Sequence, residues 1–178
     1  MKKFALYGQI HSAIKHLADQ LNEFYRLKTS EDSPLCLVVV APGAIKFYAE
    51  LCTHLTIPNI MMLVQTEPNR SQYTGRAEFV GCSSWEADGN HVVILEGMHT
   101  SGETVKYVKE AINQGAVTKS FKVAALVADS TFLEEVVKPD FALFDSRGKH
   151  VFGFGLESHD GLDRNHISLY CKEENSNQ

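Results

Sequence analysis

An acid and a group of small polar residues follow an apolar run in the middle of the chain. Residues 92–95 are all apolar, Glu96 comes directly after them, and an amphipathic segment begins at Glu103. This order predicts a buried strand that leads through a polar loop to the N-terminus of a helix. Free backbone N–H groups and the helix dipole at such a point favour a phosphate group. The loop 100–104, which supplies hydroxyls and a glycine, is therefore a candidate phosphate site.

The same residues also have ordinary explanations. Ser101 and Thr104 could cap the helix, and capping is compatible with phosphate binding. Glu96 could simply end a strand in solvent. No spacing of cysteines and histidines along the chain indicates a zinc site, and no Ser-His-Asp order is defined.

Segments with strand and helix character alternate along the chain. Helical spacing of apolar residues predicts helices over 12–27, 44–55 and 103–114 and a short one over 132–137. Apolar runs predict strands over 35–40, 60–64, 92–95, 121–127, 141–144, 151–154 and 167–171. The polar stretch 65–76 predicts a flexible functional loop, 83–90 a polar connection and 172–178 a polar tail. This alternation predicts an α/β fold with a doubly wound, mostly parallel sheet flanked by helices, whose ligands bind at the carboxyl ends of the strands.

The bulk composition fits one globular domain over residues 1–178. The net charge of -5 argues against a general nucleic-acid or anionic-membrane surface. Four widely spaced cysteines without a C-x-x-C pair predict reduced thiols and a cytoplasmic location, with Cys36 buried in its apolar run. No run approaches the roughly 20 apolar residues of a membrane span, so we expect a soluble protein.

Motifs at 96–104, 115–116, 138–141 and 149–156 stand in an order and spacing that resemble the type I phosphoribosyltransferases, most closely the bacterial hypoxanthine (guanine) branch. The resemblance extends from about Ile14 to Tyr170. It implies the family's fold, including a small hood formed by the terminal segments. It also implies the family's reaction, in which a purine base joins 5-phosphoribosyl-1-pyrophosphate, pyrophosphate is released, and Mg²⁺ is bound to the donor.

The resemblance assigns the ribose and phosphate of the donor to the loop after residue 95. The family begins this loop with two adjacent acids that bind the ribose hydroxyls, where this chain has Glu96 and Gly97. A third acid of the family handles the proton on the purine N7, and Thr100 stands in its place. The remaining positions of the phosphate-binding part are Ser101, Gly102, Glu103 and Thr104. The loop therefore keeps the groups for phosphate binding and loses a general acid/base.

Two other departures concern the pyrophosphate side and the lid. Pro42 stands where the family has a lysine before Gly43, so a cation and an N–H donor are missing. The family's lid carries a Ser-Tyr pair, for which this chain offers only Ser71-Gln72-Tyr73. His99 is adjacent to Thr100 but would point to the opposite side in extended backbone, so it is not expected to replace the acid.

The purine side resembles the family more closely. Lys138 stands where the family contacts the six-position oxygen of the purine, and His150 stands where an aromatic side chain stacks on the base. Val151 stands where backbone groups read the base edge. Glu157 corresponds to an aspartate near magnesium and pyrophosphate, and Arg164 to the pyrophosphate-binding arginine. Taken alone, Lys138, His150 and Arg164 would be ordinary solvated or structural residues.

These observations lead to three functional hypotheses. The first is a hypoxanthine/guanine phosphoribosyltransferase of purine salvage that is slow because Thr100 replaces the acid. The second is a non-catalytic purine-nucleotide binder or regulator, and the third is a scaffold that binds no nucleotide. The implied ligands are a purine base or nucleotide and the pyrophosphate donor, and family members suggest a homodimer or homotetramer.

Overall fold

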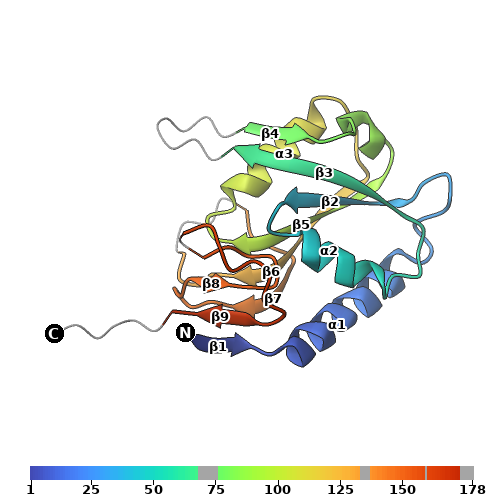
Figure 1. The fold of residues 1–178 in the computed structure, drawn as a ribbon. Coiled ribbons are helices and arrows are strands. Elements are labelled where there is room, and N and C mark those ends of the chain that lie inside the picture. The colour runs from blue at the N-terminus through green and yellow to red at the C-terminus, as the bar shows by residue number, and fades with distance from the viewer. Residues whose placement is uncertain (68–75, 133–136, 159, 173–178) are drawn as a thin grey trace.

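A computed structural model describes residues 1–67, 76–132, 137–158 and 160–172 of the chain, and two sheets organise them (Figure 1). The larger sheet has six strands in the order β4-β3-β2-β5-β6-β7. Its strands are β2 (Leu35–Ala41), β3 (Asn59–Glu67), β4 (Arg76–Phe79), β5 (His91–His99), β6 (Ser120–Ala128) and β7 (Phe141–Asp145). All neighbouring pairs are parallel except β3 and β4. The predicted mostly parallel sheet is confirmed.

Helices cover both faces of this sheet. Helices α1 (Tyr7–Tyr25) and α2 (Ile45–Cys52) pack on one face, and α3 (Glu103–Asn113) with the 3-10 helix η1 (Ser84–Ala87) lies on the other (Figure 1). The burial of β2 explains this arrangement, because Leu37 joins the core under α1 and α2 whereas Val38 joins the core under α3. Alternate side chains of a continuously apolar strand thus supply two cores, as a strand covered on both faces requires.

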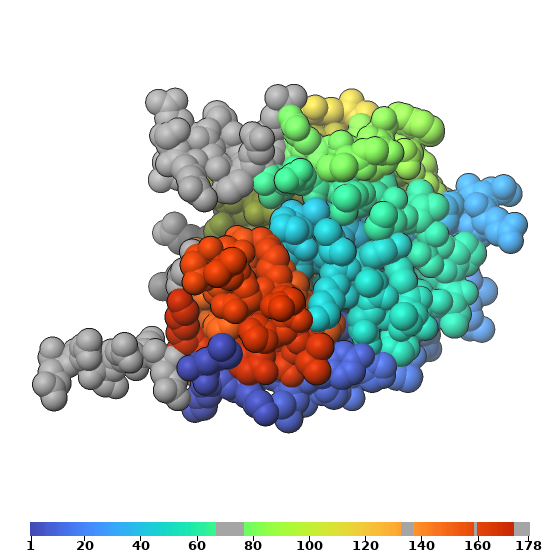
Figure 2. All heavy atoms as spheres, viewed as in Figure 1, coloured from blue at the N-terminus to red at the C-terminus, as the bar shows by residue number. Residues whose placement is uncertain are grey.

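The second sheet is the hood predicted from the terminal segments. It has the order β1-β9-β8 and is antiparallel, with β1 (Lys2–Ala5), β8 (Val151–Phe152) and β9 (Leu169–Cys171). Figure 2 shows its C-terminal part, in orange and red, against the blue N-terminus and beside the cyan segment that contains α2. The hood brings residues from both ends of the chain to the edge of the main sheet.

Several boundaries differ from the predictions. Helix α1 begins at Tyr7 rather than at residue 12, because the Leu6 N–H donates to Oε1 of Gln9 at 2.9 Å and starts the helix earlier. Strand β1 was not predicted. The two ends of the predicted 65–76 loop are strand, since β3 runs through Glu67 and β4 begins at Arg76, whereas residues 68–75 lie outside the described part of the chain. The Ser71-Gln72-Tyr73 lid, most of the 132–137 helix and most of the 172–178 tail lie outside the described residues.

The cysteines are thiols, as their spacing along the chain predicted. All four are free, and Cys36 is fully buried in β2. Burial raises the pKa of the Cys36 thiol to about 12, so this group stays protonated near neutral pH.

A helix that crosses a membrane must be long and predominantly apolar. Across the described residues, none of the helices has the length and apolar character that crossing a membrane demands.

Candidate functional site

A cavity of about 320 Å³ opens where the carboxyl ends of β2, β3 and β5 meet the hood. It is lined by residues from four separate parts of the chain: Val40, Ala41, Pro42, Gly43, Thr66, Glu96, Gly97, Met98, Thr104, His150, Val151, Leu156, Glu157 and Arg164. This is the edge at which a doubly wound sheet binds its ligands.

The cavity unites most of the residues that the sequence singled out. Nine of them line it: Pro42, Gly43, Glu96, Gly97, Thr104, His150, Val151, Glu157 and Arg164. The residues named for it that do not line it are Thr100, Ser101, Gly102, Glu103 and Lys138. Phosphate-loop, base-side and pyrophosphate-side candidates thus meet at one place, although more than 100 residues separate the first from the last.

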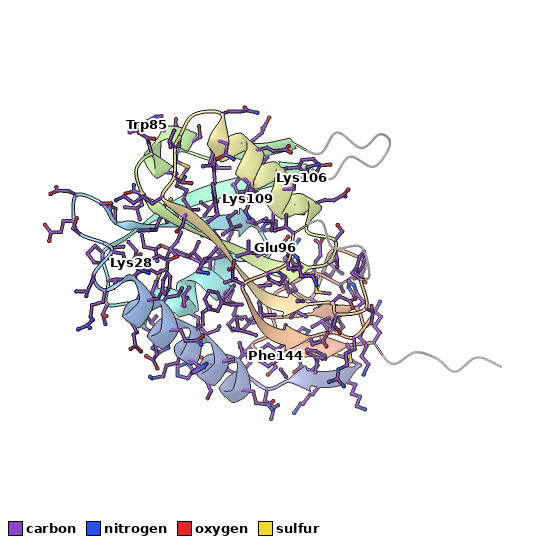
Figure 3. All side chains as sticks on the ribbon, turned by 180° about the vertical axis from the view of Figure 1, so that it is seen from behind. Lys28, Trp85, Glu96, Lys106, Lys109 and Phe144 are labelled. Atoms are coloured by element: carbon purple, nitrogen blue, oxygen red, sulfur yellow. The ribbon has the colours of Figure 1, made fainter. Side chains whose placement is uncertain are left out.

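Glu96 is held by a histidine rather than exposed to solvent. Its carboxylate is 2.6 Å from Nδ1 of His99, and both side chains are almost completely buried. Nε2 of His99 lies 2.8 Å from the carbonyl oxygen of Val137. Because a carbonyl only accepts, Nε2 carries a proton, and the contact with Glu96 holds a second proton between the two side chains. Glu96 lies in the interior of the molecule (Figure 3).

This arrangement decides two questions that the sequence left open. Glu96 does not merely end a strand in solvent, because β5 continues through His99 and the carboxylate is buried. His99 directs both ring nitrogens to protein acceptors, so it is not placed to serve as a general base. The contact between His99 and Glu96 instead fixes the orientation of the Glu96 carboxylate.

Gly97 is required by the close approach of two backbone segments. A Cβ at this position would lie 2.9 Å from the carbonyl carbon and oxygen of Gly43 and 2.6 Å from Cδ2 of Leu156. Gly155, with a φ of +99°, would likewise place a Cβ 3.0 Å from the Gly43 oxygen. The Pro42–Gly43 turn, which follows a cis Ala41–Pro42 peptide, is therefore pressed against β5 and the hood. A side chain at 97 does not fit unless this turn moves.

The N-terminus of α3 is built around Gly102. This residue is the N-cap, with a φ of +80°, and a Cβ there would collide with the Val137 carbonyl oxygen. Ser101 precedes the cap, and its hydroxyl accepts the N–H of Glu103 at 3.4 Å. Glu103 is exposed and Thr104 faces the cavity. Neither Ser101 nor Thr104 is the N-cap, since Gly102 occupies that position without a side-chain cap bond, and Thr104 lines the cavity.

Glu157 and Arg164 meet at the rim of the cavity. The guanidinium of Arg164 donates from NH2 to Oε2 of Glu157 and from NH1 to the Gly155 carbonyl, the latter at 3.0 Å. Arg164 therefore also has an ordinary structural role, as the partner of Glu157 in an ion pair. The pair still presents a cation and an anion to the cavity from adjacent positions.

The base-side candidates occupy different environments. Val151 is buried in β8, and His150 precedes it and lies nearly parallel to Phe152, with ring centroids 6.5 Å apart. Lys138 is exposed. His150 and Val151 line the cavity, whereas Phe152 is buried and does not, so the His150 ring is the one placed to stack on a planar ligand.

Asp129 is a structural residue of the site that sequence analysis missed. It follows β6 and accepts hydrogen bonds from Thr131 and from the N–H of Gly148, at 2.6 to 3.0 Å. Burial raises the pKa of Asp129, but the hydrogen bonds from Thr131 and Gly148 oppose that effect and the pKa is lowered. These bonds fix the turn that leads into His150. In the sequence, Asp129 follows the apolar run 121–127 closely, and this position at the end of a predicted strand could have identified it.

The chain belongs to the family of the phosphoribosyl transferase domain, which matches residues 7–159. It is similar to the hypoxanthine-guanine phosphoribosyltransferase of Bacillus subtilis (strain 168), with 25% identity over 151 residues that cover 84% of this chain and 81% of the relative. The enzyme of the same name from Lactococcus lactis subsp. lactis (strain IL1403) is 27% identical over 146 residues, which cover 80% of this chain and 75% of that relative.

Solved structures agree with the fold. The hypoxanthine phosphoribosyltransferase of Trypanosoma cruzi in complex with the product IMP superposes with a TM-score of 0.86 at 20% identity, covering 99% of this chain and 96% of that one. A point mutant of that enzyme, also in complex with IMP, gives a TM-score of 0.87 at 21% identity, covering 98% of this chain and 92% of that one. The resemblance to the type I phosphoribosyltransferase fold is confirmed.

Proposed function

We propose that the protein is a slow hypoxanthine/guanine phosphoribosyltransferase that converts a purine base and 5-phosphoribosyl-1-pyrophosphate into a nucleotide and pyrophosphate. The observation that carries this proposal is the cavity itself, whose lining includes nine of the candidate residues of a phosphoribosyl transferase chain at one sheet edge. We expect a cytoplasmic homodimer or homotetramer, and light scattering of the purified chain tests its size.

The proposed roles follow from what each part of the cavity offers. The N-terminus of α3, from Ser101 to Thr104, receives the 5-phosphate through backbone N–H groups and hydroxyls. Glu96, oriented by His99, accepts hydrogen bonds from the ribose hydroxyls. The base lies against His150 and Val151 in the cavity. Lys138, which is exposed and does not line the cavity, is assigned to the six-position oxygen by its place in the family motif. The Pro42–Gly43 turn and Arg164 receive the pyrophosphate.

The residues present fit a magnesium ion carried by the donor. Magnesium is usually held by one or two carboxylates together with substrate phosphates, and the carboxylates of Glu157 and Glu96 line the cavity. Glu157 is the better candidate, because its side chain is exposed at the rim, whereas the Glu96 carboxylate is buried against His99. When bound, the ion would offset the negative charge that develops on the departing pyrophosphate. Arg164 adds a positive charge beside it.

The expected slowness has a local cause. A general acid or base typically contributes about 10²–10⁴-fold to a rate, and Thr100 has no titratable group near neutral pH. His99 does not substitute for it, since its ring is fixed between Glu96 and Val137. Positioning of the two substrates and electrostatic stabilisation remain as sources of acceleration.

The direct test is release of pyrophosphate from the donor with hypoxanthine or guanine and magnesium, at high protein concentration. Omitting the purine measures hydrolysis of the donor alone. A Thr104→Val variant lacks the hydroxyl of a cavity-lining residue and should release pyrophosphate more slowly than the parent. Because the substitution would not affect a contaminating host enzyme, this loss shows that the activity belongs to the protein itself. Release no faster than the background without protein would contradict the proposal.

A second candidate function is a purine-nucleotide binder without turnover. The observation that favours it is the pyrophosphate side, where Pro42 lacks an N–H and Arg164 is already paired with Glu157. The base-side candidates His150 and Val151 and the phosphate loop 101–104 show no comparable loss. A protein of this kind would bind the monophosphate product better than the donor.

A further inference from the structure

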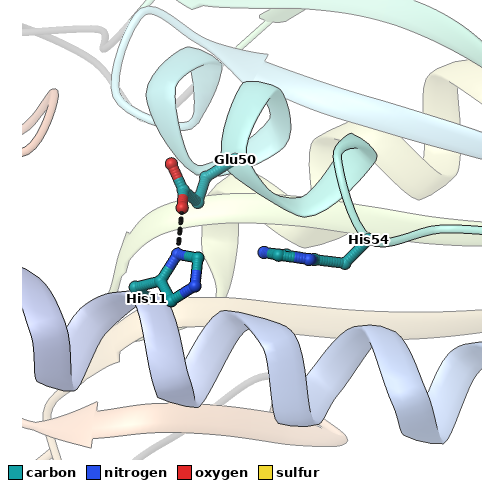
Figure 4. Close-up of side chains that lie close together, drawn as sticks. All are labelled: His11, Glu50 and His54. Atoms are coloured by element: carbon teal, nitrogen blue, oxygen red, sulfur yellow. Dashed lines mark hydrogen bonds and ion pairs between the residues drawn. The ribbon is translucent and has the colours of Figure 1, made fainter.

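Three metal-ligating side chains meet between α1 and α2, away from the cavity described above. His11 comes from α1, Glu50 from α2, and His54 from the turn that follows α2 (Figure 4). One ligand atom from each lies within 4.8 Å of the others. All three residues are partly buried. Spacing along the chain did not indicate this group, because His11 reaches the other two only through helix packing.

The histidines and the carboxylate face one another. Nδ1 of His11 is 2.6 Å from Oε1 of Glu50, and the rings of His11 and His54 meet edge to face with centroids 5.0 Å apart. Nε2 of His54 is buried and has no hydrogen-bond partner in the part of the chain that the structure describes. Figure 4 shows the His54 ring extending toward His11 and Glu50. A buried nitrogen in this state is costly unless a ligand satisfies it.

Neighbouring polar groups hold the donors in place. The Tyr7 hydroxyl lies 3.3 and 3.4 Å from the two oxygens of Glu50. The side chain of Asn22 donates to the His54 carbonyl at 3.0 Å and accepts the Thr56 N–H at 2.9 Å, which fixes the turn that carries His54. Outer contacts of this kind orient ligands at metal sites.

We propose that His11, Glu50 and His54 bind a zinc ion that clamps α1 to α2. Two imidazoles and a carboxylate form a donor set typical of zinc, with a fourth position left to water, whereas magnesium and calcium prefer oxygen ligands alone. Zinc–ligand bonds of about 2.0–2.2 Å place donor atoms roughly 3.3 Å apart in a tetrahedron. The His11 Nδ1–Glu50 Oε1 separation of 2.6 Å would have to widen toward that value, and the other separations lie within 4.8 Å.

The location makes this site independent of the transferase cavity. α2 begins directly after the Pro42–Gly43 turn, and Glu50 and His54 lie toward its opposite end. The side chain of His11 is 42% exposed, which provides an entry path for the ion. Zinc should therefore change the stability of the fold rather than serve the reaction.

The test uses the tag-free, metal-stripped full chain and zinc chloride as the probe. We expect one zinc per chain after dialysis, measured by elemental analysis, and a Tm rise of about 5–10 °C at zinc concentrations 100 times the Kd. Cobalt in place of zinc should give the visible absorption of a low-symmetry, tetrahedral ion. His54→Ala and Glu50→Gln should each abolish the Tm rise.

His16→Ala is the matched control, because His16 is an exposed histidine on the same helix outside the group. This variant should keep full zinc binding and the full Tm rise. Glu50→Gln preserves side-chain shape, so its folding in the metal-free state separates lost binding from lost structure. Absence of zinc binding, or binding unchanged in His54→Ala, would overturn the proposal. Transferase activity is not a readout, so failure of either proposal leaves the other intact.

Discussion

Thr100 is the residue at which the proposed chemistry is weakest. Its hydroxyl does not exchange a proton with a purine near neutral pH, while an aspartate at this position would. We expect Thr100→Asp to raise steady-state release of pyrophosphate by about 10²-fold, toward the usual contribution of a general acid or base. Thr100→Asn is the matched control, since it has the shape of aspartate and no titratable group. Equal activity of the two variants would show that proton transfer is not limiting.

His99 and Glu96 form a buried pair whose loss is measurable apart from any activity. Removing one partner of such a pair leaves an uncompensated charge and typically costs about 3–5 kcal/mol. We therefore expect His99→Leu to lower the free energy of unfolding by about that amount, measured by urea denaturation. Adding Glu96→Leu should recover most of it, because a buried pair exchanged for apolar residues is nearly neutral. No recovery in the double variant would mean that His99 acts mainly through Val137.

At the scale of elements, β5 and the Pro42–Gly43 turn share a contact that leaves no room for a side chain. Gly97→Ala places a methyl group 2.9 Å from the Gly43 backbone, and overpacking of this kind costs about 1–3 kcal/mol. Gly8→Ala is the control, because nothing lies within 4 Å of a Cβ there, and its stability should be equal to or above that of the parent. A fully stable Gly97→Ala would show that the turn moves easily. Restoring an acid at position 97 therefore requires a rebuilt turn, unlike the change at Thr100.

Asp129 joins the loops after β6 and β7 through hydrogen bonds to Thr131 and Gly148. Because its pKa is lowered, the free energy of unfolding should depend on pH. Its folded-state pKa is lowered, so its contribution is present above the ordinary value of 3.8 and is lost as pH falls through the folded pKa. We expect Asp129→Asn to reduce the free energy of unfolding by about 1–3 kcal/mol at pH 7, through lost charge-assisted bonds. The difference from the parent should shrink at pH 3. Asp32→Asn, at an exposed aspartate before β2, is the control, and an Asp129→Asn difference independent of pH would contradict the assignment.

The order of elements was predictable because local patterns determine it. The apolar run before Glu96 and the Pro42–Gly43 break mark strand ends, and parallel strands bring such ends to one edge. The contacts between them were not predictable. Alternation in extended backbone indicated only that His99 points away from Thr100, and it gave no sign that His99 contacts Glu96 within β5. Gly97 likewise gave no sign of its contact with Gly43, which depends on packing between strands distant in sequence.

At the scale of the whole molecule, the hood completes the site with segments that lie far apart in the chain. Strand β1 was missed because its four residues have no pattern of their own and gain their pairing from β9, near the other end. The hood also carries His150, Val151, Glu157 and Arg164 to the cavity. Base-side and pyrophosphate-side groups therefore arrive together, and ligand binding should stabilise the chain as one unit.

Because ligand binding should stabilise the whole chain, the Tm measured with each ligand distinguishes the two candidate functions. A ligand at 100 times its Kd adds about 2.7 kcal/mol, which corresponds to a Tm rise of about 5–10 °C for a chain of this size. For a slow transferase we expect inosine or guanosine monophosphate and, with magnesium, the pyrophosphate donor each to give such a rise. A rise with the monophosphates alone would favour the nucleotide binder. Inosine, which lacks the phosphate, is the control, and an equal rise with inosine would remove the phosphate site at the N-terminus of α3. No rise with any of them would leave the scaffold hypothesis.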